Sequence, residues 1–452
     1  MSVENTKFYK LTTPIFIQMV LLVVIFLTDT VFLSRVSDAA VAGVGGMMPL
    51  LLSGIALMHA FSDSGTSLLG QALGAGQPRR VSAVFAVMLL IGLLVGCSLS
   101  LSFYGLSGRL GNWMGFSPDV AEASRQYVLY IAPLFLMDAF FINLNSLLFA
   151  HGETRWNMYA AIGSAVTNFV CNIGLMYEWV PGWRLGPAEV AMATLAAQIP
   201  PILIMAYAVF VRLGVRLRLN TISRTDAVWG LKRLLRIGLP ATVEPVSQNA
   251  SQLVMMSMLA ITGTAAVAAF AYGKNLFVLL SYAGGISIGI GTQIVVSHYQ
   301  GKGAFAQADS RLKTSLKQFI PFAILVVILV NLGAHWILGL LTHDPEIIRM
   351  GQLVLLYLLI IEPMRAANFI IYPSLRGSGD VNVPVAASIV AHWGFGVGLA
   401  WYLAMHLGWG MAGVLAGIAA DELVRAMVNL QRWHAGHWQA YCTPATAASP
   451  SA

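Results

Sequence analysis

The chain has 452 residues, of which 58% are hydrophobic and only 10% are charged, and its mean hydropathy is +0.74. A soluble domain carries about 25% charged and roughly 45–50% apolar residues, so this composition excludes a soluble fold and predicts a polytopic membrane protein. The net charge of +7 does not indicate nucleic-acid binding, because Lys and Arg gather between apolar runs, where they report orientation in the membrane.

The apolar runs predict twelve membrane-spanning helices, since about 20 apolar residues cross a hydrocarbon core of about 30 Å. In the first half they cover 11–34, 39–69, 81–107, 124–150, 157–178 and 188–212. In the second half they cover 236–262, 265–297, 314–341, 347–373, 384–406 and 410–431. Such long runs exclude an outer-membrane barrel, whose strands alternate over about ten residues. The expected fold class is an all-α polytopic membrane protein.

The Lys and Arg residues predict the orientation of the chain. If both termini are cytoplasmic, most Lys and Arg residues lie on the inner side, as the positive-inside rule requires. The basic stretch between the sixth and seventh runs indicates a linker between two halves. We therefore expect a multi-pass protein of the plasma (inner) membrane with an N-lobe at 1–212, a linker at 213–235, a C-lobe at 236–433 and a tail at 434–452.

The two halves resemble each other at nearly constant spacing. The matching segments are 74–76 with 301–303, 151–153 with 378–380, and Pro14 and Gln18 with Pro240 and Glu244. Because six spans is an even number, both halves enter the membrane in the same direction, which makes a parallel repeat. Duplicated six-helix halves are typical of transporters that work by alternating access, so the pattern predicts two six-helix lobes around a central cavity.

Ionisable residues inside predicted spans are costly and mark candidate functional sites. Asp29 is the strongest candidate, because Thr28 and Thr30 flank it and it lies about 8 Å from the outer end of its predicted helix. A buried carboxylate with nearby oxygens suits a proton or a desolvated Na⁺. Thr167, Asn168 and Asn172 lie in the fifth run, and the two amides share a helix face. They could complete a set of ligands around Asp29, or they could form hydrogen bonds between two helices.

The other polar groups in the spans are candidates for the substrate cavity. Glu244 and Gln248 follow Pro240 in the seventh run, where they could line a cavity or a helix–helix contact, and Gln18 is the counterpart of Glu244 in the first run. Asp138 and Asn145 form a polar patch in the fourth run that suits packing or a cavity equally.

Three further sets of charges in the spans suggest local or cross-bundle pairing. Glu362 is placed to pair with Arg365, and Asp421 with Arg425, by helical spacing. Glu362 is also a candidate for the substrate cavity in the second lobe. Lys274 has no obvious local partner, and it could neutralise an acid across the bundle.

Several motifs resemble those of the multidrug and toxic compound extrusion (MATE) family, in the same order and over about 8–433. They are DTVFLSRVSDAAVAG at 29–43, QALGAG at 71–76, GETR at 152–155, GLPA at 238–241 and LRGSGD at 375–380. The resemblance implies two six-helix lobes in a V, with entry of Na⁺ or H⁺ driving export of cationic, often aromatic compounds. It places the first-helix acid of the family on Asp29.

The chain departs from two branches of that family. One branch joins the first-helix acid to an Asn and an Asp four residues apart, and these positions fall on Asn168 and Asn172, so the second acid is missing. Another branch carries a Glu in helix seven and an Asp in helix ten, where this chain has Gln248 and Arg365, with Glu244 and Glu362 one turn earlier. Which lobe holds the coupling ion is therefore open.

The leading hypothesis is an antiporter that exports organic cations in exchange for Na⁺ or H⁺, with Na⁺ bound at Asp29 if that is the ion. We expect such an antiporter to need no cofactor besides the coupling ion and to bind no nucleic acid. We also expect it to be a monomer in the lipid bilayer. The alternative is a flippase for a lipid-linked or amphiphilic substrate, although Lys274, Arg365 and Arg425 are few cations for a phosphate-binding cavity. An importer of a cationic metabolite is also open. An intramembrane enzyme is disfavoured, because no nucleophile–base pair is evident and the chain is duplicated.

Overall fold

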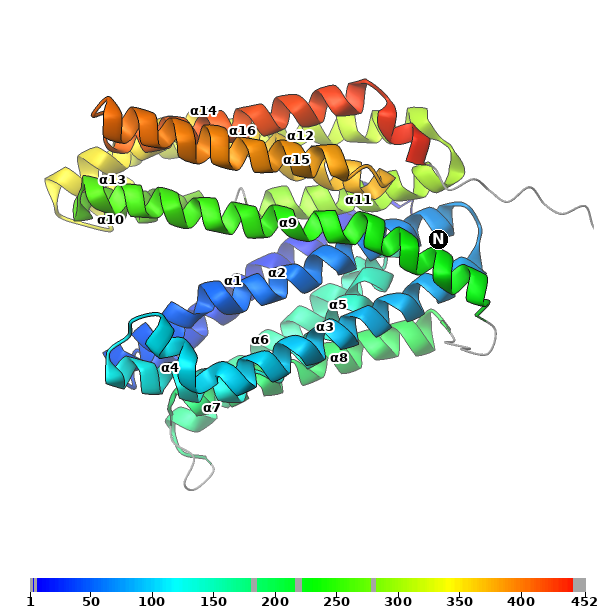
Figure 1. Cartoon of the computed structure of the whole chain (residues 1–452), viewed down its shortest axis with the longest axis horizontal. Helices are drawn as coiled ribbons and strands as arrows, with labels where there is room; N and C mark the ends of the chain where they lie inside the picture. The colour runs from blue at the N-terminus through cyan, green and yellow to red at the C-terminus, as the bar shows by residue number, and fades with distance from the viewer. Residues whose placement is uncertain (1–2, 4–5, 180–184, 216–221, 278–281, 442–452) are drawn as a thin grey trace, which may run out of the picture. The chain divides into compact units, whose positions relative to one another are not determined.

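The computed structural model describes residues 3, 6–179, 185–215, 222–277 and 282–441. All regular secondary structure in these residues is helical, which confirms the predicted all-α class (Figure 1). The chain divides into two compact units. Unit 1 comprises Met1–Leu69 and Gln77–Gly238, and unit 2 comprises Gly70–Gly76 and Leu239–Ala452.

Unit 1 contains the helices of the first six predicted runs. They are α1 (Phe8–Leu33), α2 (Asp38–Gly74), α3 (Pro78–Trp113), α4 (Pro118–Ile131), α5 (Leu134–Ala150), α6 (Thr154–Met176), α7 (Pro187–Ala197), α8 (Ile199–Ala206) and the π-helix η2 (Tyr207–Arg212). The last turn of α2 belongs to unit 2, and α9 (Arg224–Thr262) begins in unit 1 and continues into unit 2.

Unit 2 contains the helices of the remaining runs. They are α10 (Thr264–Phe277), α11 (Gly284–Lys302), α12 (Phe305–Leu332), α13 (Ala334–Gly339), α14 (Pro345–Ser378), α15 (Asn382–Val390), the π-helices η5 (Ala391–Leu399) and η6 (Tyr402–His406), α16 (Met411–His434) and the 3₁₀-helix η7 (His437–Tyr441). Each predicted run therefore falls on one or more helices.

Several runs predicted as one helix are broken. The run at 124–150 is divided into α4 and α5, which bend by 48° at Pro133 because proline supplies no backbone N–H to the preceding turn. Among the described residues, eight helices are long and apolar enough to cross a membrane, or nine if this bent pair counts as one span. The three runs that fall short correspond to α9, to α10 with α11, and to α16. Polar residues such as Glu244 and Gln293 lie in α9 and α11, α10 has only 14 residues, and α16 carries charged residues such as Asp421.

A left-handed glycine ends corresponding helices in the two halves. Gly152 follows α5 with a φ of 72°, and Gly379 follows α14 with a φ of 95°. Only glycine adopts this conformation without strain, so these residues reverse the chain directly after a long helix. This explains why the segments 151–153 and 378–380 carry the same glycine.

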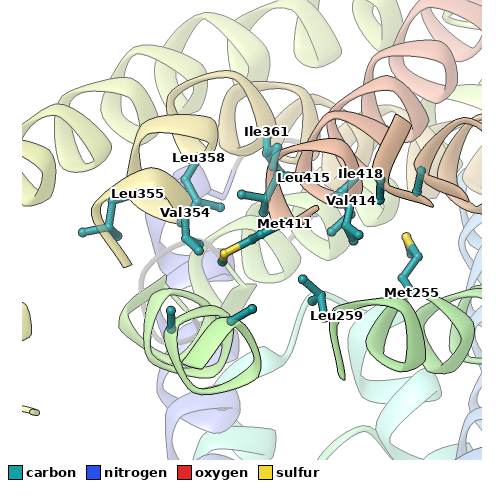
Figure 2. Close-up of a cluster of buried hydrophobic side chains, with 14 of the residues drawn as sticks. Met255, Leu259, Val354, Leu355, Leu358, Ile361, Met411, Val414, Leu415 and Ile418 are labelled. Atoms are coloured by element: carbon teal, nitrogen blue, oxygen red, sulfur yellow. The ribbon is translucent and has the colours of Figure 1, made fainter. Parts of the chain in front are cut away.

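Each unit has its own apolar core. In unit 1 the core includes Met47, Val128 and Phe135 from α2, α4 and α5. In unit 2, side chains of α9, α14 and α16 point toward one another, among them Leu259, Leu358 and Leu415 (Figure 2). These cores hold rigid helices on which the polar side chains described next are placed.

Candidate functional site

The polar site of unit 1 is built around Asp29, a residue of α1 with only 7% of its surface exposed. Asn168 and Asn172 of α6 each donate a hydrogen bond from Nδ2 to Oδ1 of Asp29, both at 2.9 Å. Thr194 of α7 donates from Oγ1 to Oδ2 at 3.1 Å. We call these four residues the Asp29 site. It joins three helices of unit 1 at one carboxylate.

Helix geometry explains how α6 supplies two ligands. Asn168 and Asn172 are one turn apart, so both amides lie on the same face of α6, and that face packs against α1. Both amides are completely buried. The single Thr194 proton is shared between Asp29 Oδ2 and the Val190 carbonyl, which lies 3.0 Å from Oγ1.

The structure does not bring every predicted oxygen ligand to Asp29. Thr28 is half-buried and Thr30 is exposed, and both donate to carbonyls of their own helix, those of Val24 and Phe26, so these flanking hydroxyls do not serve the carboxylate. Thr167 is half-buried and makes no hydrogen bond to it. Neighbours along a helix point in different directions, and sequence proximity was a misleading signal here.

Sequence reasoning missed Thr194 and Tyr127. The phenol of Tyr127 in α4 is buried within electrostatic range of Asp29. The only signal for Thr194 was a hydroxyl within the apolar sixth run, and nothing in the sequence indicates that α7 reaches Asp29.

The Asp29 site contains no cation from the protein. Within the described part of the chain, no Lys, Arg or His nitrogen lies within ion-pair distance of the Asp29 carboxylate. The three hydrogen-bond donors are neutral amides and a hydroxyl. Asn172 Oδ1 is also buried without a hydrogen-bond partner among the described residues. One carboxylate, amide oxygens and a hydroxyl are groups that can hold a proton or ligate a small hard cation.

The other candidates of unit 1 make separate contacts. Asp138 is buried and accepts a hydrogen bond from Gln198 Nε2 at 3.1 Å. Asn145 accepts a hydrogen bond from Asn157 of α6. Gln18 is 2% exposed, and its Oε1 has no hydrogen-bond partner among the described residues. Within the described residues, no hydrogen bond joins these groups to the Asp29 site.

Unit 2 contains a buried network of charged side chains on α14 and α16. The predicted pairs are confirmed, since Arg365 pairs with Glu362 and Arg425 pairs with Asp421 at 2.9 Å. Glu422 joins them, at 3.0 Å from Arg365 and 2.9 Å from Arg425. Both guanidinium groups are therefore neutralised inside the lobe, as buried charges require.

The helix-seven candidates lie beside this network. Glu244 is half-buried on α9 within electrostatic range of Arg425 and Arg376, but it makes no ion pair. Gln248, one turn later, is half-buried.

Comparisons with known proteins identify the family. The MatE family model matches residues 14–173 and 240–402. The chain is 30% identical to "Uncharacterized transporter YisQ" of Bacillus subtilis (strain 168), over 96% of this chain and 95% of that protein. It is 24% identical to "Probable multidrug resistance protein NorM" of Thermotoga maritima, over 95% and 92% of the two chains.

Solved structures show the same fold. A crystal structure of MATE in the bent conformation matches with a TM-score of 0.86 and 21% identity, over 96% of this chain and 95% of that one. A transporter from Pyrococcus furiosus, described as having a binding pocket of reverse polarity, matches with a TM-score of 0.85 and 21% identity, over 97% and 96%. The chain is thus an all-helical, multi-pass membrane protein, and it belongs to the MatE family of transporters.

Proposed function

We propose that this protein is a secondary antiporter that exports organic cations, drugs among them, in exchange for inward Na⁺ or H⁺. Relatives named as multidrug resistance proteins support drug export. The observation that carries the coupling is the buried Asp29 carboxylate, held by three neutral donors from two other helices.

The physical reason for ion binding is the cost of a buried charge. An ionised carboxylate away from water is unfavourable unless it is paired, and neutral hydrogen bonds offset only part of that cost. A proton or Na⁺ would neutralise it. Asn172 Oδ1 would then accept a hydrogen bond from the protonated acid or provide an oxygen ligand to Na⁺.

Ion binding would act on the packing of three helices. Asp29 accepts hydrogen bonds from α6 and α7, so neutralising it weakens these bonds and changes how α1 rests against its neighbours. If the two resulting conformations differ in substrate affinity, binding of the ion and of the substrate is linked by a coupling free energy. Alternating access of two lobes would convert this linkage into transport. We propose an N-lobe at 1–212, a linker at 213–235, a C-lobe at 236–433 and a tail at 434–452.

The exposed side chains support a location in the lipid bilayer. Many large apolar side chains are exposed on both units, including Leu101, Val166, Leu332 and Leu356. Such a surface suits direct contact with lipid, as expected for a monomer in the plasma (inner) membrane. The distribution of Lys and Arg supports cytoplasmic termini.

Efflux from proteoliposomes tests the function. Ethidium efflux would be followed with a pH gradient or a Na⁺ gradient imposed in turn, for wild type, Asp29→Asn and Asp38→Asn. Asp38 is an exposed acid at the start of α2 and serves as the matched control. We expect one gradient to drive wild-type efflux, and Asp29→Asn to reduce it at least about tenfold, within the usual range of coupling free energies. Asp38→Asn should transport like wild type.

The driving gradient names the coupling ion. Wild-type behaviour in Asp29→Asn would remove Asp29 from the coupling mechanism. Absence of transport under both gradients would contradict the antiporter itself.

A further inference from the structure

The first turns of α9 carry a high density of positive charge. Between residues 222 and 238 the charged residues are a single acid, Asp226, and the cations Arg224, Lys232, Arg233 and Arg236. This segment belongs to unit 1, as does the start of α3, where two more cations, Arg79 and Arg80, are adjacent. The proposed antiport uses none of these side chains.

The indole of Trp229 contacts cations from both helices. Arg80 Cζ lies 4.6 Å from the centroid of the Trp229 ring, and Arg233 Cζ lies 5.6 Å from it. Arg80 also lies 3.8 Å from an Asp226 oxygen and donates a hydrogen bond to Gln77 Oε1 at 2.7 Å. Cation–π contacts and the ion pair therefore hold the start of α3 against the first turns of α9, and they bring positive charge from two helices together.

These cations stand at the ends of two predicted membrane spans. Arg79 and Arg80 directly precede the apolar run at 81–107, and Lys232 and Arg233 precede the run at 236–262. Cations and Trp in such positions lie at the level of the lipid headgroups. Lipid phosphate groups lie at the same level, so the cluster is placed to meet them.

One face of α9 combines two of the cations with exposed apolar side chains. Lys232 and Arg236 are exposed and one turn apart. At spacings that keep residues on one side of a helix, Leu239, Val243 and Val246 follow, with 53%, 45% and 49% of their surfaces exposed. We call these three residues the apolar stripe. A phospholipid has its groups in the same order, a phosphate followed by acyl chains, so this face of α9 matches a phospholipid along its length.

The excess of positive charge favours an anionic headgroup. A guanidinium group binds phosphate through two parallel hydrogen bonds, and a lysine adds a point charge. In phosphatidylcholine the choline cation offsets the phosphate and is repelled by the cluster, whereas phosphatidylglycerol keeps a net negative charge. The cluster therefore distinguishes lipids by headgroup charge.

We propose that the start of α9, together with Arg80 of α3, is a binding surface for an anionic phospholipid. Lys232 and Arg236 contact the headgroup phosphate, and the acyl chains lie along the apolar stripe. Arg80 and Arg233, held on the Trp229 ring, add to the positive potential around the headgroup. This surface uses no residue of the Asp29 site, so it does not rest on the proposed antiport.

Two lipids that differ in headgroup charge test the proposal. Phosphatidylglycerol and phosphatidylcholine would carry the same fluorescent label on one acyl chain, and their affinities would be measured by fluorescence anisotropy with the purified full-length protein in detergent. One variant combines Lys232→Gln with Arg236→Gln, and a second combines Lys232→Arg with Arg236→Lys. The matched control combines Lys7→Gln with Lys317→Gln, which removes two exposed lysines elsewhere in the chain.

We expect the wild type to bind phosphatidylglycerol at least about tenfold more tightly than phosphatidylcholine. Replacing Lys232 and Arg236 with Gln should remove most of this preference, because each cation near an anionic lipid contributes about fivefold in affinity. The charge-conserving variant and the control should keep the preference. Added salt should weaken binding of phosphatidylglycerol alone, because screening acts on the charge.

Three results would overturn the proposal. Equal wild-type affinity for the two lipids would show that the surface does not distinguish headgroup charge. An equal loss in the two double Gln variants would show that net charge, and not this surface, attracts the lipid. Displacement of phosphatidylglycerol by inorganic phosphate at the same concentration as by unlabelled lipid would identify a site for free phosphate. None of these results depends on an ion gradient, so a lipid preference without gradient-driven efflux would contradict the antiport alone.

Discussion

At the scale of single residues, the direction of each hydrogen bond matters more than the number of polar atoms. All three bonds at Asp29 run toward the carboxylate, from Asn168, Asn172 and Thr194. A protonated acid needs one acceptor, and Asn172 Oδ1 is the buried atom available for that role. Because Asn172 stands where one branch of the family has a second acid, the Asp29 site has a single carboxylate, and in the proposed mechanism one proton or one Na⁺ neutralises it.

The contact between Asp29 and Thr194 predicts a measurable coupling. In a double-mutant cycle with Asp29→Asn and Thr194→Val, we expect a coupling free energy of about 0.6 kcal/mol, the average for hydrogen bonds between membrane helices, and at most about 1.7 kcal/mol. It would be measured from the unfolding free energies of the purified proteins in mixed micelles.

Thr30→Val provides the control for this cycle. The Thr30 hydroxyl is bonded to its own helix at Phe26, so its coupling to Asp29→Asn should be close to zero. Equal coupling for Thr30 and Thr194 would show that the hydrogen bond from α7 contributes nothing specific.

At the scale of helices, small residues allow helices of the same unit to pack closely. In unit 2, a Cβ atom added to Gly289 of α11 would lie 2.0 Å from the carbonyl oxygen of Phe369 on α14. Backbone cannot move aside as a flexible side chain can, so glycine is needed there for α11 and α14 to pack.

Gly289→Ala should therefore destabilise the protein. We expect a loss of about 1–3 kcal/mol in the free energy of unfolding, typical of overpacking, measured as a lower unfolding midpoint. Gly105→Ala on α3 is the matched control, because nothing lies within 4 Å of an added Cβ, and alanine favours a helix by about 1 kcal/mol over glycine. A Gly289→Ala protein as stable as Gly105→Ala would contradict the close packing of α11 on α14.

At the scale of the whole molecule, the two units treat buried charge differently. Unit 1 holds Asp29 among neutral groups, whereas unit 2 pairs Glu362, Asp421 and Glu422 with Arg365 and Arg425. An isolated carboxylate responds to an ion, because binding removes its desolvation cost. A paired network resists change, because removing either partner strands a buried charge. In the proposed antiporter, this contrast favours Asp29 of unit 1 over the paired acids Glu362, Asp421 and Glu422 of unit 2 as the coupling group.

Orientation in the membrane is a second property of the whole chain. We expect Ser117→Cys to react with a membrane-impermeant maleimide in intact cells, and Ser223→Cys to react only after permeabilisation. Both serines are exposed between helices, and the native Cys97, Cys171 and Cys442 would first be replaced by Ser. The prediction follows from the concentration of Lys and Arg on the side of Ser223. The reverse labelling pattern would place the termini outside.

The amino-acid sequence by itself determined the membrane class, the positions of the twelve apolar runs and the pair Asn168 and Asn172 on one face of α6. It also predicted the local pairs Glu362–Arg365 and Asp421–Arg425. The membrane class and the apolar runs follow from composition. The shared face and the local pairs follow from a spacing of three or four residues, which helical periodicity brings to one side of a helix.

Only the tertiary structure decided which helix faces meet. It brought Thr194 of α7 to Asp29, turned Thr28 and Thr30 away from it, and broke the fourth run at Pro133. Among the described residues, it placed no carboxylate within ion-pair distance of Lys274. The physical reason is that a helix periodicity constrains contacts within one turn but not the rotation and depth of one helix against another. Those are set by the packing of apolar side chains and close glycine contacts across the whole lobe.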